Sequence, residues 1–260
     1  MELGKRMKEY EQVSRFYLTK RTPVIIRIDG RAFHSFTKGL KKPFDDRLMD
    51  IMQQTMLFLC DNIQGCKIGY TQSDEISLLI TDFDNIESSS WFNNNLCKFV
   101  SISASLATQQ FNKLVSEFIN KLEKQIELDF EFLSNENYRE ITKLLKLWED
   151  KEFRATFDSR AFNLPKEEVC NYFIWRQQDA TRNAIQSAGQ SEFSYKELNG
   201  KKCNEIQEML FTEKGINFNN YNPCFKRGSC AIKTETGWII DKNIPIFTQN
   251  RTYIDKYLII

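Results

Sequence analysis

Residues 24–31 of this chain have the sequence VIIRIDGR. The β-branched run at its start predicts a strand that is buried in a sheet. The strand leads directly into Asp29, and the glycine that follows lets backbone N–H groups approach a phosphate closely. The stretch therefore predicts an acidic side chain and an accessible backbone at the end of a core strand.

A second acidic pair lies between two further predicted strands. Residues 67–70 and 76–80 predict strands, and a hairpin turn over residues 71–75 holds Asp74 and Glu75. If these strands neighbour the first one, two carboxylates face one small space, where they repel unless cations bridge them or one takes up a proton. Mg²⁺ accepts a few carboxylates, and two such ions roughly 4 Å apart can clamp the attacking and leaving oxygens of a phosphoryl transfer.

The segment after the first aspartate also carries hydrogen-bond donors and positive charge that suit a phosphate. These residues are Arg31, His34, Lys38, Lys41 and Lys42. The acidic residues and these basic residues also have an ordinary structural explanation. Acidic residues at strand ends often form turns or caps, and basic residues are common on surfaces. The sequence contains no GxxxxGK[ST] motif, which argues against a P-loop nucleotide site.

The composition excludes several classes of site. The 260 residues suggest one large domain or two small ones, and 36 basic against 35 acidic residues give a net charge of +1. Any basic surface for a nucleic acid must therefore be local. A single histidine excludes zinc sites that need two or three histidines. The seven cysteines are irregularly spaced and form no C-x-x-C pair, so we expect free and mostly buried thiols.

The rest of the chain predicts mainly helices. They cover residues 5–20, the segment after a cap at Asp45 or Asp46, residues 91–120, a helical hairpin over residues 116–150, and residues 166–190. Residues 230–233 and 238–240 predict a C-terminal β-hairpin. No repeat or linker divides the chain.

We therefore expect one compact catalytic domain over residues 1–260. Its parts are a core over roughly residues 5–115, a helical extension over roughly residues 116–150, and a C-terminal part over residues 151–260.

Short motifs occur in a fixed order along the chain. They are Arg27-Ile28-Asp29-Gly30-Arg31, Phe33-His34, Lys42-Pro43, Gln72-Ser73-Asp74-Glu75, Lys98-Phe99, Phe157-Asp158, Trp175-Arg176-Gln177, Asp179 and Lys226-Arg227-Gly228. This set resembles the tRNA(His) guanylyltransferase family and its guanylyltransferase-like relatives over roughly residues 5–235. An ordered set of motifs is far more specific than any one of them.

The resemblance implies an α/β (α+β) fold like a polymerase palm, with a mainly antiparallel sheet backed by helices and with extra C-terminal helices and a hairpin. It implies a nucleotidyltransferase that works as a 3′-5′ polymerase on the 5′ end of tRNA. ATP would first activate the 5′-monophosphate as an adenylylated end. The 3′-hydroxyl of an incoming NTP, such as GTP, would then attack that end and displace AMP.

The resemblance also implies roles for individual residues. Asp29 and Asp74 would hold two Mg²⁺ ions with the Gly30 carbonyl, and Glu75 would support this catalytic group. The backbone of Gly30, Arg31, Ala32, Phe33 and His34 would cradle a triphosphate; Lys42, Asp45, Ser73, Asp74 and Lys98 would engage a nucleotide or its phosphates; and Arg27, Asn183, Lys226 and Arg227 would contact tRNA.

The chain departs from the eukaryotic histidine-tRNA enzymes at two places. Those enzymes carry HINNLYN where this chain has Thr181–Ser187, of which only Asn183 is retained. Asn94 and Asn95 stand where those enzymes have two arginines. The pattern WRQxDATRN instead resembles the guanylyltransferase-like branch, which favours template-dependent repair of 5′-truncated tRNAs. We therefore expect pairing with the 3′ side of the acceptor stem to choose the incoming nucleotide, with non-templated guanylate addition to histidine tRNA as the alternative.

Two other function classes share part of this pattern. A nucleotide cyclase with the same palm also needs two strand-end carboxylates and Mg²⁺, and would form a cyclic product from ATP without tRNA. A non-catalytic tRNA-binding module would bind tRNA without Mg²⁺-dependent chemistry. The joint presence of Asp29, Ser73, Asp74 and Lys42 argues against the binding module.

The expected partners are tRNA, nucleoside triphosphates and further copies of the chain in a homotetramer built as a dimer of dimers. No stretch approaches the ~20 apolar residues of a membrane span, so we expect no membrane partner. The N-terminus has no apolar signal region, so the expected location is the cytoplasm.

Overall fold

One antiparallel sheet organises the computed structural model, which describes residues 2–129 and 134–259. Its six strands lie in the order β4-β1-β3-β2-β5-β6. Their bounds are β1 Val24–Gly30, β2 Cys66–Gln72, β3 Glu75–Ile80, β4 Phe157–Asn163, β5 Ser229–Thr234 and β6 Gly237–Asp241. The mixed α/β fold with a mainly antiparallel sheet backed by helices is thereby confirmed.

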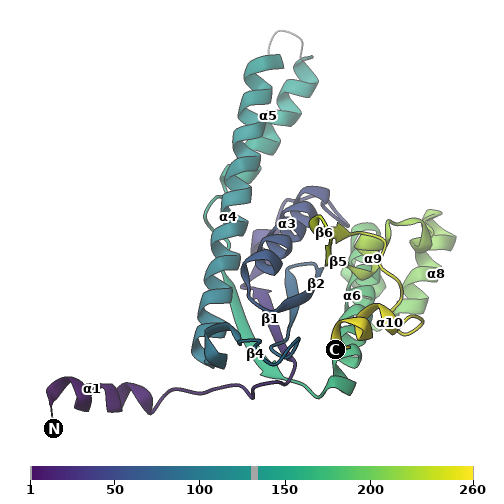
Figure 1. The fold of residues 1–260 in the computed structure, drawn as a ribbon. Helices are drawn as coiled ribbons and strands as arrows, with labels where there is room; N and C mark the ends of the chain where they lie inside the picture. The colour runs from purple at the N-terminus through teal and green to yellow at the C-terminus, as the bar shows by residue number, and fades with distance from the viewer. Residues whose placement is uncertain (1, 130–133, 260) are drawn as a thin grey trace.

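Helices cover both faces of this sheet (Figure 1). The long ones are α3 Asp46–Asn62 and α4 Leu96–Asp129 on one face, and α6 Lys166–Glu192 on the other. The remaining helices are α1 Leu3–Gln12, α2 Phe33–Phe36, η1 Trp91–Asn94, α5 Asn135–Glu149, α7 Tyr195–Leu198, α8 Cys203–Lys214, η2 Phe218–Asn220, α9 Pro223–Arg227, α10 Thr252–Asp255 and η3 Lys256–Leu258. None of the helices in the described ranges is long and apolar enough to cross a membrane.

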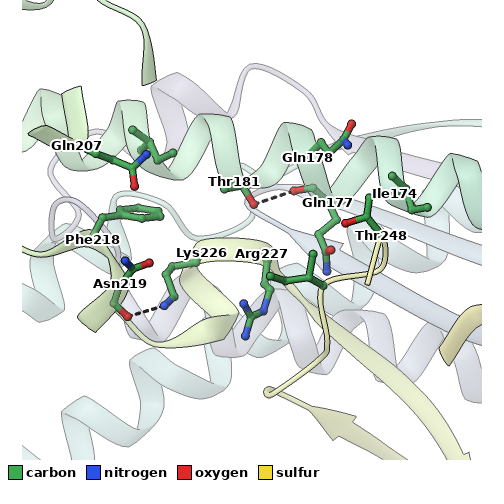
Figure 2. A pocket seen from close by; sticks show the side chains of 12 residues that line it. Ile174, Gln177, Gln178, Thr181, Gln207, Phe218, Asn219, Lys226, Arg227 and Thr248 are labelled. Carbon is green, nitrogen blue, oxygen red and sulfur yellow. Dashed lines mark hydrogen bonds between the residues drawn. The ribbon is translucent and has the colours of Figure 1, made fainter. Parts of the chain in front are cut away.

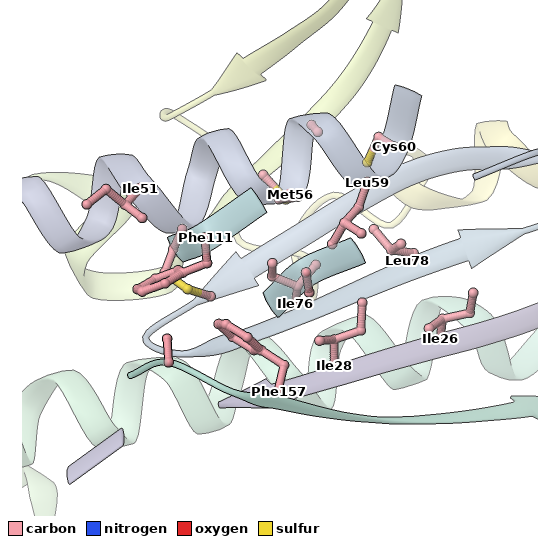
Figure 3. Close-up of a cluster of buried hydrophobic side chains, with 14 of the residues drawn as sticks. Ile26, Ile28, Ile51, Met56, Leu59, Cys60, Ile76, Leu78, Phe111 and Phe157 are labelled. Carbon is pink, nitrogen blue, oxygen red and sulfur yellow. The ribbon is translucent and has the colours of Figure 1, made fainter. Parts of the chain in front are cut away.

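Alternation along the central strands separates two hydrophobic layers. Ile26 and Ile28 of β1, with Ile76 and Leu78 of β3, pack against the α3 and α4 side in the cluster shown in Figure 3. Ile25, Leu79 and Tyr70 point to the opposite face, where they join Val169 and Phe173 of α6. The odd-numbered residues of β1 therefore all face α6, and Asp29 is one of them.

Several local predictions are confirmed. Asp45 caps α3, with its side chain accepting from the N–H groups of Arg47 and Leu48. The strands β1, β2 and β3, the hairpin β5–β6, and α6 all lie within two or three residues of their predicted bounds. All seven cysteines are free thiols, and four of them are buried.

Other predictions need correction. The helix predicted over residues 5–20 ends at Gln12, because the next segment runs extended and pairs Tyr17 with Asn95. The hairpin turn predicted over residues 71–75 contains only Ser73 and Asp74, since Gln72 already pairs with Glu75. The helix predicted over residues 91–120 begins as the short η1 and continues as α4 to Asp129. The edge strand β4 and the helix α8 were not predicted.

Two segments project from the sheet and its helices (Figure 1). One is α1, none of whose residues is buried. The other is the hairpin of α4 and α5, whose base is fixed by Trp148 against Phe118 at 5.1 Å between ring centroids. Part of the predicted hairpin, residues 130–133, lies outside the described residues. The boundaries of the single domain stay a prediction.

Candidate active site

Two aspartates lie together at one edge of the sheet, as the sequence predicts for neighbouring strands. In the β1–β3 ladder, Asp29 stands opposite Glu75. The backbone N–H of Gly30 donates to the carbonyl oxygen of Asp74 at 3.0 Å, which ties the end of β1 to the hairpin turn. The turn thus brings Asp74 beside the end of the strand that carries Asp29.

The electrostatics of this pair are those of like charges in a partly buried place. Burial raises the pKa of Asp74, and the neighbouring charge of Asp29 raises it further, while the Ser73 hydroxyl, which donates to Asp74 Oδ1 at 2.9 Å, opposes the rise. A bound cation would relieve this repulsion.

The chemistry of the donors fits Mg²⁺. Asp29, Asp74 and the Gly30 carbonyl would supply only part of a ligand sphere, because no group of three or more His, Cys, Asp or Glu side chains in the described residues is arranged to hold a metal. Mg²⁺ is typically bound in that way, by one or two carboxylates together with water and substrate phosphates.

Glu75 has a different environment from the two aspartates. It is buried, and both of its carboxylate oxygens are engaged: Arg176 Nε donates to Oε1 at 2.7 Å, and Arg27 Nη2 lies 2.6 Å from Oε2. Burial raises the pKa of Glu75, and the two guanidinium groups oppose that rise. The predicted catalytic role of Glu75 stays a prediction, but the geometry makes it a paired carboxylate.

Arg27 belongs to the same group. Its guanidinium lies 5.9 Å from the centre of the Trp175 ring and is paired with Glu75. Its predicted contact with tRNA stays a prediction, since the structure already gives its charge a partner within the protein.

The predicted phosphate loop follows β1 directly. A Cβ atom on Gly30 would lie 2.3 Å from the Phe33 ring, so the glycine is required by the packing of a core phenylalanine. The N–H groups of Gly30 and Arg31 already donate to Asp74 and Thr156. The backbone from Ala32 to His34, with Ala32 in the left-handed region at φ 54°, is the part left to face a phosphate.

The outer nucleotide residues lie in diverse settings. The Asp45 carboxylate accepts from three backbone N–H groups, those of Lys41, Arg47 and Leu48, so the structure gives it a capping role. Lys42 is exposed in the loop before α3. Lys98 is exposed on the first turn of α4, with its Nζ 5.2 Å from the centre of the Phe92 ring. Their contacts with a nucleotide stay predictions.

Lys226 and Arg227 line a pocket of about 360 Å³ that does not include the two aspartates. Figure 2 shows this pocket between α6 on one side and α9 with η2 on the other. Its walls hold Ile174, Gln177, Gln178, Thr181, Ile185, Gln207, Phe218, Asn219, Ile246 and Thr248 besides the two cations. No acidic residue is among these lining residues, so the pocket suits an anionic group.

The two cations of the pocket are held by backbone oxygens. Lys226 Nζ donates to the Asn219 carbonyl at 2.6 Å, and Arg227 Nε donates to the Ile244 carbonyl at 3.0 Å. Burial, and then the charge of Arg227, lower the pKa of Lys226. Asn183, the other residue predicted to contact tRNA, is exposed on α6 and does not line the pocket.

Sequence reasoning overlooked one neighbour of Asp29 and one of Glu75. Asp158 of β4 stands opposite Asp29 on the other side of β1. Arg176 reaches Glu75 from α6. Both residues belong to motifs that the sequence shows, but their positions beside Asp29 and Glu75 depend on how β4 and α6 pack on the sheet.

Two protein-family models match this chain. The family model of tRNA(His) guanylyltransferase matches residues 4–165, and the model described as the Thg1 C terminal domain matches residues 167–253. The chain belongs to the tRNA(His) guanylyltransferase family. Enzymes of this family are nucleotidyltransferases, and the chain is therefore a nucleotidyltransferase of tRNA processing.

Individual relatives agree with this assignment. The chain is 27% identical over 242 residues to a probable tRNA(His) guanylyltransferase of Dictyostelium discoideum, covering 86% of this chain and 82% of that protein. It is 28% identical over 240 residues to the tRNA(His) guanylyltransferase of Debaryomyces hansenii, covering 87% of this chain and 78% of that protein.

Solved structures of this guanylyltransferase family are similar to this chain over its whole length. A bacterial tRNA(His) guanylyltransferase-like protein in complex with ATP is 42% identical, covers both chains fully and superimposes with a TM-score of 0.86. A bacterial guanylyltransferase-like protein in complex with GTP is 37% identical, again over the whole of both chains, with a TM-score of 0.75.

Proposed function

We propose that this guanylyltransferase-family enzyme adds nucleotides in the 3′-5′ direction to the 5′ end of truncated tRNA, with the tRNA itself as template. ATP activates the 5′-monophosphate by forming an adenylylated end and releasing pyrophosphate. The 3′-hydroxyl of the incoming NTP then attacks the activated phosphate, and AMP leaves. The observation that carries the proposal is the convergence of Asp29 and Asp74 at one sheet edge.

Asp29, Asp74 and the Gly30 carbonyl would hold the two Mg²⁺ ions of this reaction. When bound, Mg²⁺ neutralises phosphate charge and stabilises the leaving group. The chain itself contributes the placement of the carboxylates by the β1–β3 ladder and the donors that follow β1. The bacterial relatives solved in complex with ATP and with GTP support nucleoside triphosphates as the substrates.

The pocket beside α9 suits a phosphate of the tRNA or of the second nucleotide. Lys226 and Arg227 place two positive charges there, and Phe218 offers an apolar face. Phosphate contacts of this kind position an RNA without reading its sequence. A mechanism that leaves base choice to pairing within the tRNA needs no more than this from the protein.

The choice of branch rests on two observations. The guanylyltransferase-like structures are 42% and 37% identical, whereas the D. discoideum and D. hansenii relatives are 27% and 28% identical. Thr181, where eukaryotic histidine-tRNA enzymes have the first residue of HINNLYN, lies in the wall of the pocket and bonds to the Gln177 carbonyl. Both favour the guanylyltransferase-like branch, for which we expect templated repair and not non-templated guanylate addition. The cytoplasmic location and the homotetramer stay predictions.

A panel of tRNAs that lack their first nucleotide tests the proposal. Each tRNA carries a different base opposite the gap and is incubated with ATP, Mg²⁺ and each of the four NTPs. We expect addition of the complementary nucleotide in every case. Addition of guanylate whatever the opposing base would select the non-templated alternative, and a cyclic product from ATP alone would select a cyclase.

A further inference from the structure

A chain of charged side chains links α6 to the hairpin that carries Asp74. Arg176 bonds through Nε to Glu75 at 2.7 Å and through Nη2 to Asp179 at 2.7 Å. Arg182, one turn further along α6, pairs with the second oxygen of Asp179. These ion pairs form a network that extends from the exposed surface of α6 to a carboxylate at the start of β3.

The inner part of this network is rigid and dry. The side chains of Arg176 and Glu75 are only 3% and 4% exposed. The Arg176 guanidinium also lies 4.3 Å from the centre of the Trp175 ring. Two charges with so little access to water keep one geometry, because any movement leaves a buried charge without a partner.

Glu75 lies next to both aspartates, so its fixed position constrains theirs. It directly follows Asp74 in the chain and stands opposite Asp29 in the ladder. Both of its oxygens are engaged by arginines, whereas the carboxylate of Asp74 accepts from the Ser73 hydroxyl. Cross-strand neighbours on one face have side chains about 5 Å apart, so an unpaired Glu75 would compete with the aspartates for any cation there.

We propose that Arg176 is a positioning residue, which holds Glu75 away from the metal ligands and fixes the Ser73–Asp74 turn so that Asp74 faces Asp29. This inference rests on the proposed function, because it takes Asp29 and Asp74 as the residues that hold the divalent cations. It also assigns α6 a function in the chemistry. The Arg176–Glu75 ion pair joins the segment matched by the second family model to the hairpin matched by the first.

Arg176→Lys is the most informative variant. It keeps the positive charge, so the protein should fold, but a lysine cannot bond to Glu75 and Asp179 with the fixed fork of a guanidinium. Arg176→Gln and Glu75→Gln test the two ends of the pair. The matched control is Arg182→Gln, which removes another arginine of the same network that does not touch Glu75.

Four quantities are measured for each variant. They are the affinity for Mn²⁺, by electron paramagnetic resonance with a non-hydrolysable ATP analogue present; kcat and KM on a 5′-truncated tRNA; and the melting temperature. Loss of a residue that orients metal ligands typically costs 10–100-fold in metal affinity. We expect Arg176→Lys to weaken Mn²⁺ binding and lower kcat by about 10-fold or more, with KM for tRNA unchanged and Arg182→Gln like the unaltered protein.

Two results would overturn the inference. One is Mn²⁺ affinity and kcat within about twofold of the unaltered protein in both Arg176 variants. The other is a loss in Glu75→Gln that neither Arg176 variant shares, since Glu75 would then act on the metal itself. If the unaltered protein adds no nucleotide to any tRNA, the proposed function fails, while the Mn²⁺ measurements still decide the role of Arg176.

Discussion

Asp29 and Asp74 reach the same sheet edge from opposite strand directions. Asp29 comes at the end of β1, and Asp74 lies in the two-residue turn before the antiparallel β3. A single ladder register therefore decides whether the two carboxylates meet. A one-residue slip would turn the side chain of Asp29 to the other face of the sheet, toward α3 and α4.

Removing either carboxylate should abolish catalysis without unfolding the protein. We expect Asp29→Asn and Asp74→Asn each to lower adenylylation and nucleotide addition by at least ~100-fold, because each removes charge that the bound cations need. Asp84→Asn is the control, since Asp84 follows the far end of β3 and pairs with Lys67. Activity near that of the control in either variant would remove that aspartate from the site.

The raised pKa of Asp74 predicts a pH dependence of stability. Because burial and the charge of Asp29 raise the pKa in the folded state, folding favours the protonated acid. Its stabilising contribution is present below the ordinary value of 3.8 and is lost as the pH rises through the raised pKa. Urea unfolding without divalent cations should therefore show the unaltered protein losing stability relative to Asp74→Asn as the pH rises from 3.8 through the raised pKa, and a gain in stability with this rise in pH would contradict the assignment.

At the level of elements, local sequence signals identified most of the strands and long helices. β1 is a β-branched run, and α3 has a capping aspartate at Asp45, so each is visible within a short window. β4 escaped prediction because Ser159 and Ala161, which follow Phe157 on its inner side, give only a weak apolar alternation, and because its pairing depends on the distant β1.

The candidate site likewise has residues that local sequence predicts and residues that it does not. The two aspartates could be predicted, since each follows from a strand and its end. The Arg176–Glu75 pair could not, because it joins residues 101 positions apart through the packing of α6 on the sheet. The helix predicted over residues 5–20 was too long because Val13, Phe16 and Tyr17 continue the helical spacing of apolar residues beyond Gln12. They are 82%, 62% and 54% exposed, and Tyr17 pairs with Asn95 in an extended segment.

The α4–α5 hairpin offers a test of the single domain. Trp148 is completely buried at its base, against Phe118. We expect Trp148→Ala to lower the free energy of unfolding by about 3–5 kcal/mol. The loss should appear as one shifted cooperative transition in calorimetry, as for a single folding unit.

Tyr195→Ala is the matched control for that variant. The Tyr195 side chain is 82% exposed, so its removal should change the free energy of unfolding by no more than about 0.5 kcal/mol. Two separate transitions in Trp148→Ala, with the main one unchanged, would show that the hairpin unfolds independently of the sheet.

For the whole molecule, the sheet acts as the frame between two kinds of site. One edge holds the aspartates, and α6 connects that edge to the pocket lined by Lys226 and Arg227. The net charge of +1 means that RNA must be recognised through such local positive groups. α1 and the outer part of the α4–α5 hairpin project away from the sheet and do not pack on it (Figure 1).

The central claim is that Asp29 and Asp74 together hold the divalent cations that receive a nucleotide's phosphates. Crystals of the protein grown with Mn²⁺ and ATP, measured at a wavelength where manganese scatters anomalously, test it most directly. We predict two anomalous peaks about 4 Å apart between these carboxylates and the triphosphate. Nucleotide bound elsewhere, or manganese bound without contact to both aspartates, would contradict the claim.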